Sequence, residues 1–114
     1  MLAGKTVLLV EDEVMVALLA EMMLRDMGAA EVILAHTLTE GQSALERMPD
    51  LAVLDINLRG EESFPIAEAL AARGTPYVYA TAYGNAAAED GPSAPIVTKP
   101  YDEAALRAAL GEVL

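Results

Sequence analysis

Short apolar segments alternate along this chain with segments of helical periodicity, and this alternation restricts the fold more than any other feature. Each apolar segment is a run of aliphatic, β-branched or aromatic residues without polar interruption, which favours a strand buried on both faces. The predicted strands are Thr6–Val10, Glu31–Ala35, Leu51–Ile56, Tyr77–Ala80 and Ile96–Thr98. Strands separated by helices of about 10–15 residues predict an α/β fold with a parallel sheet and helices on both of its faces.

The helical segments carry start and stop signals of their own. Val14, Leu18 and Met22 recur at helical spacing, and Gly28 ends that helix. Thr37-Leu-Thr-Glu40 has the spacing of a capping box. The predicted helices are Val14–Met27, one from Thr37 to Met48 before Pro49, one from Ser63 or Phe64 to Gly74 with Pro65 in its first turn, and Glu103–Val113 capped by Asp102.

The segment 83–95 departs from this rhythm. Only Asn85–Asp90 can be helical before Gly91-Pro92, and these residues include almost no large apolar side chain to pack against a sheet. We therefore expect the fourth helix to be short, frayed or absent.

Composition excludes several classes of function. The 114 residues suit one domain, and 7 Lys and Arg against 18 Asp and Glu give a net charge of −11, which opposes binding to nucleic acid or to anionic membranes. Without cysteine, the chain has no disulfide, thiolate zinc site or cysteine nucleophile, and His36 is its one histidine. The chain shows neither a signal-peptide pattern nor a membrane-spanning apolar segment, so we expect a cytoplasmic protein.

Polar residues follow the predicted strands where each strand ends. Glu11-Asp12-Glu13 follow the first strand, Asp55 lies at the end of the third, Thr81 follows the fourth and Lys99-Pro100 follow the fifth. The carboxyl ends of parallel strands meet at one edge of a sheet, where ligands bind. Carboxylates gathered there repel one another unless a cation joins them, and oxygen ligands favour Mg²⁺.

Four motifs carry a resemblance to a known family. Val10-Glu11-Asp12-Glu13, Leu54-Asp55-Ile56-Asn57-Leu58, Ala80-Thr81-Ala82 and Thr98-Lys99-Pro100-Tyr101 stand in the order and at the strand ends found in receiver domains of two-component response regulators. The chain resembles that family from end to end, as one receiver domain over residues 1–114. The resemblance implies a flavodoxin-like, doubly wound, five-stranded parallel sheet in the order 2-1-3-4-5.

The resemblance also implies a role for each matching residue. Asp55 is then the phosphorylation site, Lys99 pairs with Asp55 and afterwards with a phosphoryl oxygen, and the Thr81 hydroxyl binds another phosphoryl oxygen. The implied Mg²⁺ ligands are Asp12, Asp55, the backbone carbonyl of Asn57 and, through water, Glu11. In this family the bond corresponding to Lys99-Pro100 is usually cis.

A closer similarity links the segment Pro76–Gly84 to a stand-alone receiver subgroup of alphaproteobacteria. Its pattern Pro-Phe-x-Phe-Ala-Thr-Gly-aromatic corresponds here to Tyr77, Tyr79, Ala82 in place of the glycine, and Tyr83. The broader family usually has an aromatic switch three residues before the lysine, where this chain has Ile96. We therefore expect switching through Thr81 together with Tyr79 or Tyr83.

The function implied is a phosphorylation-dependent switch rather than an enzyme with a separate substrate. Its expected partners are a sensor histidine kinase or phosphotransfer protein and an unidentified protein target, with no nucleic acid and no membrane. The target would bind a face that includes Tyr79, Tyr83 and Tyr101. The chain itself would be a monomer or a weak homodimer.

Other interpretations of the same residues remain open at this point. Glu11–Glu13 can act as an acidic helix cap, and the chain can be a receiver-like scaffold that binds partners without phosphorylation. A Mg²⁺-dependent phosphohydrolase or a Toprim nuclease fits less well, because the acids are not in the arrangements those enzymes use. Five methionines serve as core filler and surface cover, with a methionine-rich partner groove as the alternative: Met15, Met22, Met23, Met27 and Met48.

Overall fold

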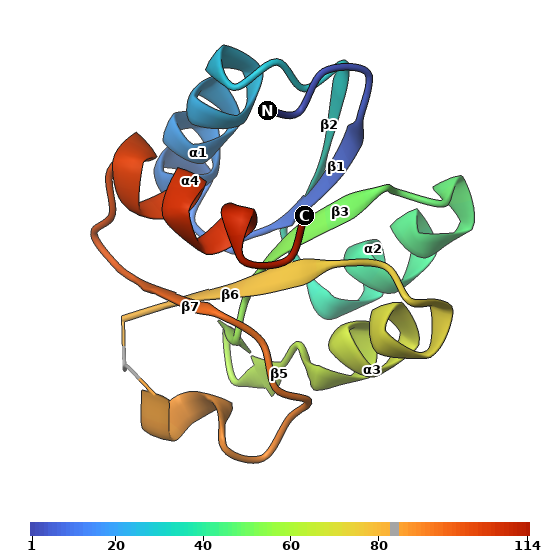
Figure 1. Ribbon diagram of the computed structural model, residues 1–114. Coiled ribbons are helices and arrows are strands. Elements are labelled where there is room, and N and C mark those ends of the chain that lie inside the picture. Colours follow the sequence, from blue (N-terminus) through green and yellow to red (C-terminus); the bar gives the residue numbers. More distant parts are fainter. Residues whose placement is uncertain (83–84) are drawn as a thin grey trace.

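A computed structural model describes residues 1–82 and 85–114. In this part of the chain five parallel strands form one sheet: β1 (Thr6–Val10), β2 (Glu31–Ala35), β3 (Leu51–Asp55), β6 (Tyr77–Thr81) and β7 (Ile96–Thr98). Their spatial order is β2-β1-β3-β6-β7 (Figure 1). Since β6 and β7 are the fourth and fifth strands of this sheet along the chain, the predicted order 2-1-3-4-5 is confirmed.

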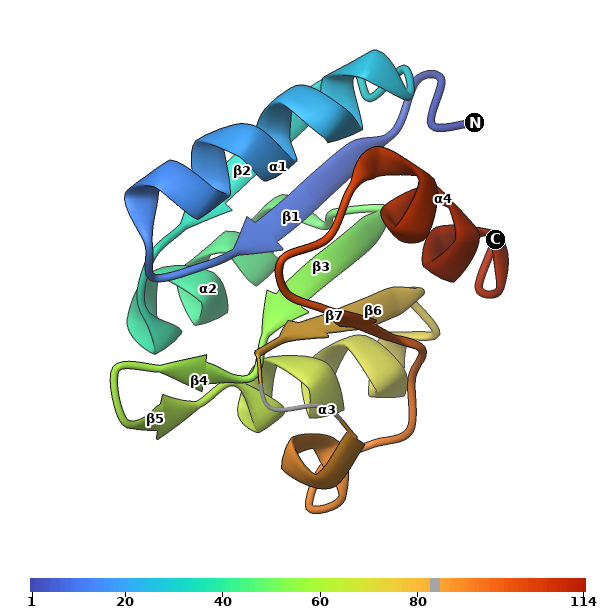
Figure 2. The ribbon, with the colours of Figure 1, turned by 90° about the vertical axis from the view of Figure 1, so that its left-hand side faces the viewer.

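Helices cover both faces of the sheet (Figures 1 and 2). Helices α1 (Val14–Asp26) and α4 (Glu103–Gly111) lie on one face, and α2 (Leu38–Ala44) and α3 (Phe64–Arg73) lie on the other. Val7 and Leu9 of β1 pack toward α1 and α4, whereas Leu8 and Val10 pack in the core beneath α2 and α3. Alternate side chains of one strand thus enter two separate cores, which is why the strand sequences are apolar without interruption.

The capping residues act as their sequence positions predict. The Thr37 hydroxyl accepts a hydrogen bond from the Glu40 backbone N–H at 3.1 Å, and the Glu40 carboxylate accepts one from the His36 N–H at 2.7 Å. Asp102 accepts from the Ala105 N–H at 2.8 Å, and Gly74 ends α3 with a left-handed φ of 71°. These contacts satisfy backbone groups that have no partner within the helix itself.

Helix α2 is shorter than predicted. It ends at Ala44, and a turn of 3₁₀ helix, η1 (Leu45–Arg47), replaces the expected continuation to Met48. Met48 has a left-handed φ of 51°. Because the residue before a proline is disfavoured in the right-handed helical conformation, Pro49 forces this ending. Smaller differences of one or two residues occur at the ends of α1 and α4.

A two-stranded hairpin, which the sequence analysis did not predict, follows β3. Its strands β4 (Asn57–Leu58) and β5 (Glu61–Glu62) project from the sheet edge (Figure 2). The predicted third strand is one residue too long, because Ile56 leaves the sheet and is buried in the core together with Leu58. The Ile56 carbonyl accepts from the Ser63 N–H at 2.8 Å and closes the base of the hairpin.

The expected short fourth helix corresponds to a turn of 3₁₀ helix, η2 (Asn85–Ala88). The chain then passes Gly91, which lies so close to Phe64 that a Cβ atom there would meet the ring at 2.3 Å. Within residues 1–82 and 85–114, no helix combines the length and the apolar character needed to cross a membrane.

Candidate functional site

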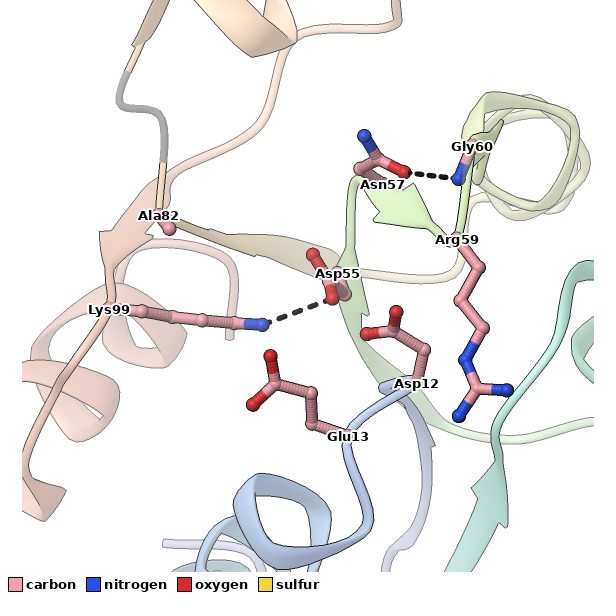
Figure 3. Close-up of a pocket in the computed structure, with 8 residues that line it drawn as sticks. All are labelled: Asp12, Glu13, Asp55, Asn57, Arg59, Gly60, Ala82 and Lys99. Carbon is pink, nitrogen blue, oxygen red and sulfur yellow. Dashed lines mark hydrogen bonds and ion pairs between the residues drawn. The ribbon is translucent and has the colours of Figure 1, made fainter.

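The polar residues predicted to meet at one edge of the sheet do so. Glu11 and Asp12 follow β1, Asp55 is the last residue of β3, Thr81 is the last residue of β6 and Lys99 follows β7. Figure 3 shows the Asp12, Asp55 and Lys99 side chains pointing toward one another across this edge. The parallel arrangement explains the convergence, since every strand presents its carboxyl end on the same side.

Lys99 is the cation at the centre of the site. Its Nζ donates a hydrogen bond to Asp55 Oδ2 at 3.0 Å and forms an ion pair with Glu11 Oε1. The second Glu11 oxygen, Oε2, accepts from the Glu13 N–H at 3.1 Å. Burial acts to lower the pKa of Lys99, but hydrogen bonds to Glu11 and Asp55 outweigh it and hold the pKa above its usual value. The ammonium is therefore charged at neutral pH.

The acidic groups are crowded, with Glu11 and Asp55 buried and Asp12 half-buried. Oxygen atoms of Glu11, Asp12 and Asp55 lie within 4.8 Å of one another. Burial, followed by the charge of Glu11, raises the pKa of Asp55 from 3.8 to about 7, against the opposing effect of Lys99. Burial also acts to raise the pKa of Asp12, but hydrogen bonds with Glu11 and Asp55 outweigh burial and keep the pKa of Asp12 below its usual value. Such crowding favours a bound cation over three separate charges.

The donor set fits a hard divalent cation. Three carboxylates supply only oxygen ligands, as Mg²⁺ prefers. Asn57 lines the same pocket, and its side-chain Oδ1 accepts a hydrogen bond from the Gly60 N–H at 2.8 Å. The role of the Asn57 backbone carbonyl as a metal ligand stays a prediction.

A pocket of about 340 Å³ opens above these groups. It is lined by Asp12, Glu13, Asp55, Asn57, Arg59, Gly60, Ala82 and Lys99 (Figure 3). Thr81 is buried next to it, and its carbonyl accepts the Lys99 N–H at 2.8 Å. Arg59 was not assigned a role from the sequence, and Glu13 was considered only as part of an acidic helix cap. Arg59 and Gly60 form the turn of the hairpin, and Gly60 was the local signal for that turn.

Tyr79 lies in the core rather than on a partner-binding face. Its side chain is 0% exposed, its ring packs edge-to-face on Phe64, and its hydroxyl donates to the Pro92 carbonyl at 2.7 Å. The prediction that Tyr79 contributes to an exposed face is therefore wrong, because β6 is covered on both sides. The hydroxyl nevertheless ties β6 to the segment before β7, and a switching role for Tyr79 stays a prediction.

The remaining predictions have mixed outcomes. The Lys99-Pro100 bond is cis, as the resemblance implied. Tyr83, the other predicted switch residue, lies outside the described residues. Ile96 pairs with Tyr79 across β6 and β7 and is partly buried against the core beneath α2 and α3. Tyr101 is partly buried beside the site, where burial and then the charge of Glu11 raise its pKa to about 12.

Helix α1 turns an apolar face to solvent beside the site. We define the α1 stripe as its exposed large apolar residues: Val14, Met15, Leu18, Leu19 and Met22. The small residues Ala17 and Ala20 face the sheet together with Leu24. Of the five methionines, only Met27 is fully buried, whereas Met15, Met22 and Met48 are 63–70% exposed, so core filling explains few of them.

An apolar groove of about 320 Å³ runs between the α1 stripe and the segment that follows β7. Val16, Leu19 and Met23 of α1 line one side, and Pro100 and Tyr101 line the other. Glu13, Ala82 and Lys99 line both this groove and the acidic pocket, so the two cavities adjoin.

Several solved structures are similar to this chain over nearly its whole length. The solution structure of SdrG from Sphingomonas melonis Fr1 is 34% identical, with 99% of this chain and 98% of SdrG covered and a TM-score of 0.81. The PhyR response regulator REC domain of Erythrobacter litoralis is 27% identical over 97% of this chain and 90% of that one, with a TM-score of 0.85.

The chemotaxis protein CheY4 of Vibrio cholerae is 21% identical, with 98% of this chain and 100% of CheY4 covered and a TM-score of 0.82. At this identity the likeness supports the fold alone. No family model and no curated protein matches the chain. The fold is that of a receiver domain. The chain belongs to the two-component response regulator receiver family.

Proposed function

We propose that residues 1–114 form a receiver domain that accepts a phosphoryl group on Asp55 from a sensor histidine kinase or phosphotransfer protein in the cytoplasm. The observation that carries this proposal is the position of the Asp55 carboxylate. It faces a pocket, hydrogen-bonded to Lys99 at 3.0 Å and within 4.8 Å of two further acids. The output would be a change in protein binding.

The chemistry follows from this arrangement. An Asp55 oxygen attacks phosphorus, and the electron pair of the breaking bond leaves with the donor. Lys99 then neutralises charge on a phosphoryl oxygen, and the Thr81 hydroxyl donates to another. Glu11, Asp12 and Asp55 would hold Mg²⁺, which supplies positive charge to the phosphoryl oxygens. Burial and then the Glu11 charge raise the pKa of Asp55 to about 7 against the opposing effect of Lys99, so a bound cation would favour the deprotonated nucleophile.

A partner protein has a surface available next to the pocket. The α1 stripe and the groove beside Tyr101 are apolar, and the groove adjoins Lys99. A donor that brings its phosphoryl group to Asp55 must cover the adjacent surface. We therefore propose that the histidine kinase or phosphotransfer protein contacts the α1 stripe during transfer.

The test of the acceptor is incubation with acetyl phosphate and Mg²⁺, read by intact mass. We expect the gain of one phosphoryl group, lost in Asp55→Asn and with EDTA but retained in Asp26→Asn, which alters an exposed acid at the end of α1. Absence of a mass gain with both acetyl phosphate and the cognate kinase would refute the proposal. Partner binding that persists in that case would establish the scaffold, and multiple turnover of a phosphomonoester would establish a phosphohydrolase.

The contact with the donor protein has its own matched pair of variants. Met22 in the stripe is 63% exposed, and Met48, outside it, is 66% exposed. Met22→Gln should slow transfer from the kinase while leaving acetyl phosphate labelling unchanged, and Met48→Gln should alter neither. Equal kinase rates for the two variants would remove the α1 stripe from the proposal.

A further inference from the structure

Arg59 differs from the other arginines of this chain in having no partner among the residues that the structure describes. Within the described part of the chain, its guanidinium makes no hydrogen bond or ion pair, although it lines the acidic pocket (Figure 3). The other four arginines are all engaged: Arg25 with Glu21, Arg47 with Glu31, Arg107 with Glu103, and Arg73 with the Leu45 carbonyl. Among the described residues, the Arg59 guanidinium is thus unpaired in a pocket that is also lined by three carboxylates.

The backbone at Arg59 is unusual as well. Arg59 and Gly60 have φ values of 55° and 92° and form the two-residue turn between Leu58 and Glu61, with the positive φ values of a type I′ hairpin. The first position of such a turn, here Arg59, favours glycine or asparagine, and a residue such as arginine is disfavoured there. The hairpin therefore holds a long cationic side chain where a glycine would be better for the fold. Disfavoured conformations of this kind concentrate at functional sites.

The charges of the pocket indicate what Arg59 binds. Lys99 already pairs with both Asp55 and Glu11, so its single charge is shared between two acids before a phosphoryl group arrives. An incoming phosphoryl group carries two negative charges into a pocket whose remaining lining acids are Asp12 and Glu13. A guanidinium presents a planar fork of N–H donors that matches two oxygens of a phosphoryl group.

We propose that Arg59 is a phosphoryl-binding residue that contacts the oxygens of the group being transferred to Asp55. This inference rests on the proposed function and adds to it a second protein cation, beside Lys99. With acetyl phosphate, the bond between phosphorus and the acetate oxygen breaks, acetate leaves with the electron pair, and a bond forms from an Asp55 oxygen to phosphorus. Arg59 supplies only hydrogen bonds and positive charge to the phosphoryl oxygens.

The experiment uses variants that separate the guanidinium from the turn. Arg59→Gly removes the side chain and suits the left-handed backbone, so the fold should be retained or stabilised. Arg59→Lys keeps the charge without the fork. Arg107→Ala is the matched control, because it changes the net charge equally while removing only a surface ion pair on α4. Rates of Asp55 labelling by acetyl phosphate are measured by intact mass at saturating Mg²⁺.

We expect labelling of Arg59→Gly to be slower than that of the unmodified chain by about tenfold. This is less than the roughly 100- to 1,000-fold typical for loss of one donor in a water-excluded site, because Arg59 is exposed. Arg59→Lys should be intermediate and Arg107→Ala unchanged. The affinity for beryllium fluoride, a phosphoryl mimic, should fall in parallel, whereas Mg²⁺ affinity should hold or rise because a competing cation is gone. Arg59→Gly labelling at the unmodified rate overturns this inference alone. No labelling of the unmodified chain, also with the kinase, overturns the proposed function instead.

Discussion

Replacing Asp55 with asparagine should stabilise this protein in the absence of metal. Burial and the neighbouring Glu11 charge raise the pKa of Asp55 from 3.8 to about 7 in the folded state. The unfolded chain has no such shift, so between these two values the folded protein binds more protons than the unfolded one. Stability contributed by this group is therefore full below about pH 4 and falls as the pH rises through about 7.

The magnitude follows from that shift. About three pKa units at about 1.36 kcal/mol each give roughly 4 kcal/mol of destabilisation above pH 7. This cost already includes the favourable effect of Lys99. Asparagine carries no charge and removes the cost, but its amide group must itself be buried. We expect Asp55→Asn to raise the free energy of unfolding by about 2 kcal/mol at about pH 8, once roughly half of the gain is offset by desolvation of the amide.

Urea denaturation followed by circular dichroism, in EDTA, measures the difference. Glu46→Gln is the control, since it removes an exposed acid remote from the pocket. The advantage of Asp55→Asn should shrink as the pH is lowered toward about 4. Saturating Mg²⁺ should reverse it, because a ligand at about 100 times its dissociation constant stabilises the unmodified protein by about 2.7 kcal/mol. An Asp55→Asn variant less stable than the unmodified chain in EDTA at about pH 8 would refute this electrostatic account.

Three further changes test other parts of the structure. Gly91→Ala forces a Cβ atom to 2.3 Å from the buried Phe64 ring and should cost about 1–3 kcal/mol in urea denaturation; a neutral result would contradict this packing. Tyr79→Phe removes the hydrogen bond to the Pro92 carbonyl and should lower the free energy of unfolding by about 1 kcal/mol. The backbone N–H of residue 79, which bonds to the segment before β7, should then exchange faster with solvent. Unchanged exchange would argue that the hydroxyl does not hold β6 to that segment. The pKa of Tyr101 is raised from 10.0 to about 12 by burial, so the unfolded chain ionises first and stability falls between these values. In denaturation at about pH 9 and at about pH 11, the free energy of unfolding of Tyr101→Phe should fall less between the two pH values than that of the unmodified chain.

The strand positions and the site residues were predictable because their signals are local. A strand covered on both faces needs an unbroken apolar run, and the acid or lysine that ends such a run must lie at the sheet edge. The positions of Asp55 and Lys99 therefore followed from the sequence, and the tertiary structure added their 3.0 Å contact. The hairpin at Arg59 was not predicted although Gly60 favours a turn, because arginine is not a residue that marks the first position of a type I′ turn.

Helix α1 shows where the sequence alone was insufficient. Val14, Leu18 and Met22 form an apolar row at helical spacing, yet each of the three is at least 44% exposed. The helix is apolar on nearly all sides, so its sequence does not say which side faces the sheet. The small side chains of Ala17 and Ala20 let the helix lie close to the strands, and this packing leaves the larger residues outside.

The amino-acid sequence by itself thus determined the order of strands and helices and the identity of the acids and the lysine at the sheet edge. Only the tertiary structure decided which face of α1 is buried, that Tyr79 lies in the core, and which cation of the pocket has no partner among the described residues. The physical reason is that strand patterning and capping depend on neighbours in the sequence. The burial of a helix face or of Tyr79 depends instead on how distant elements pack together.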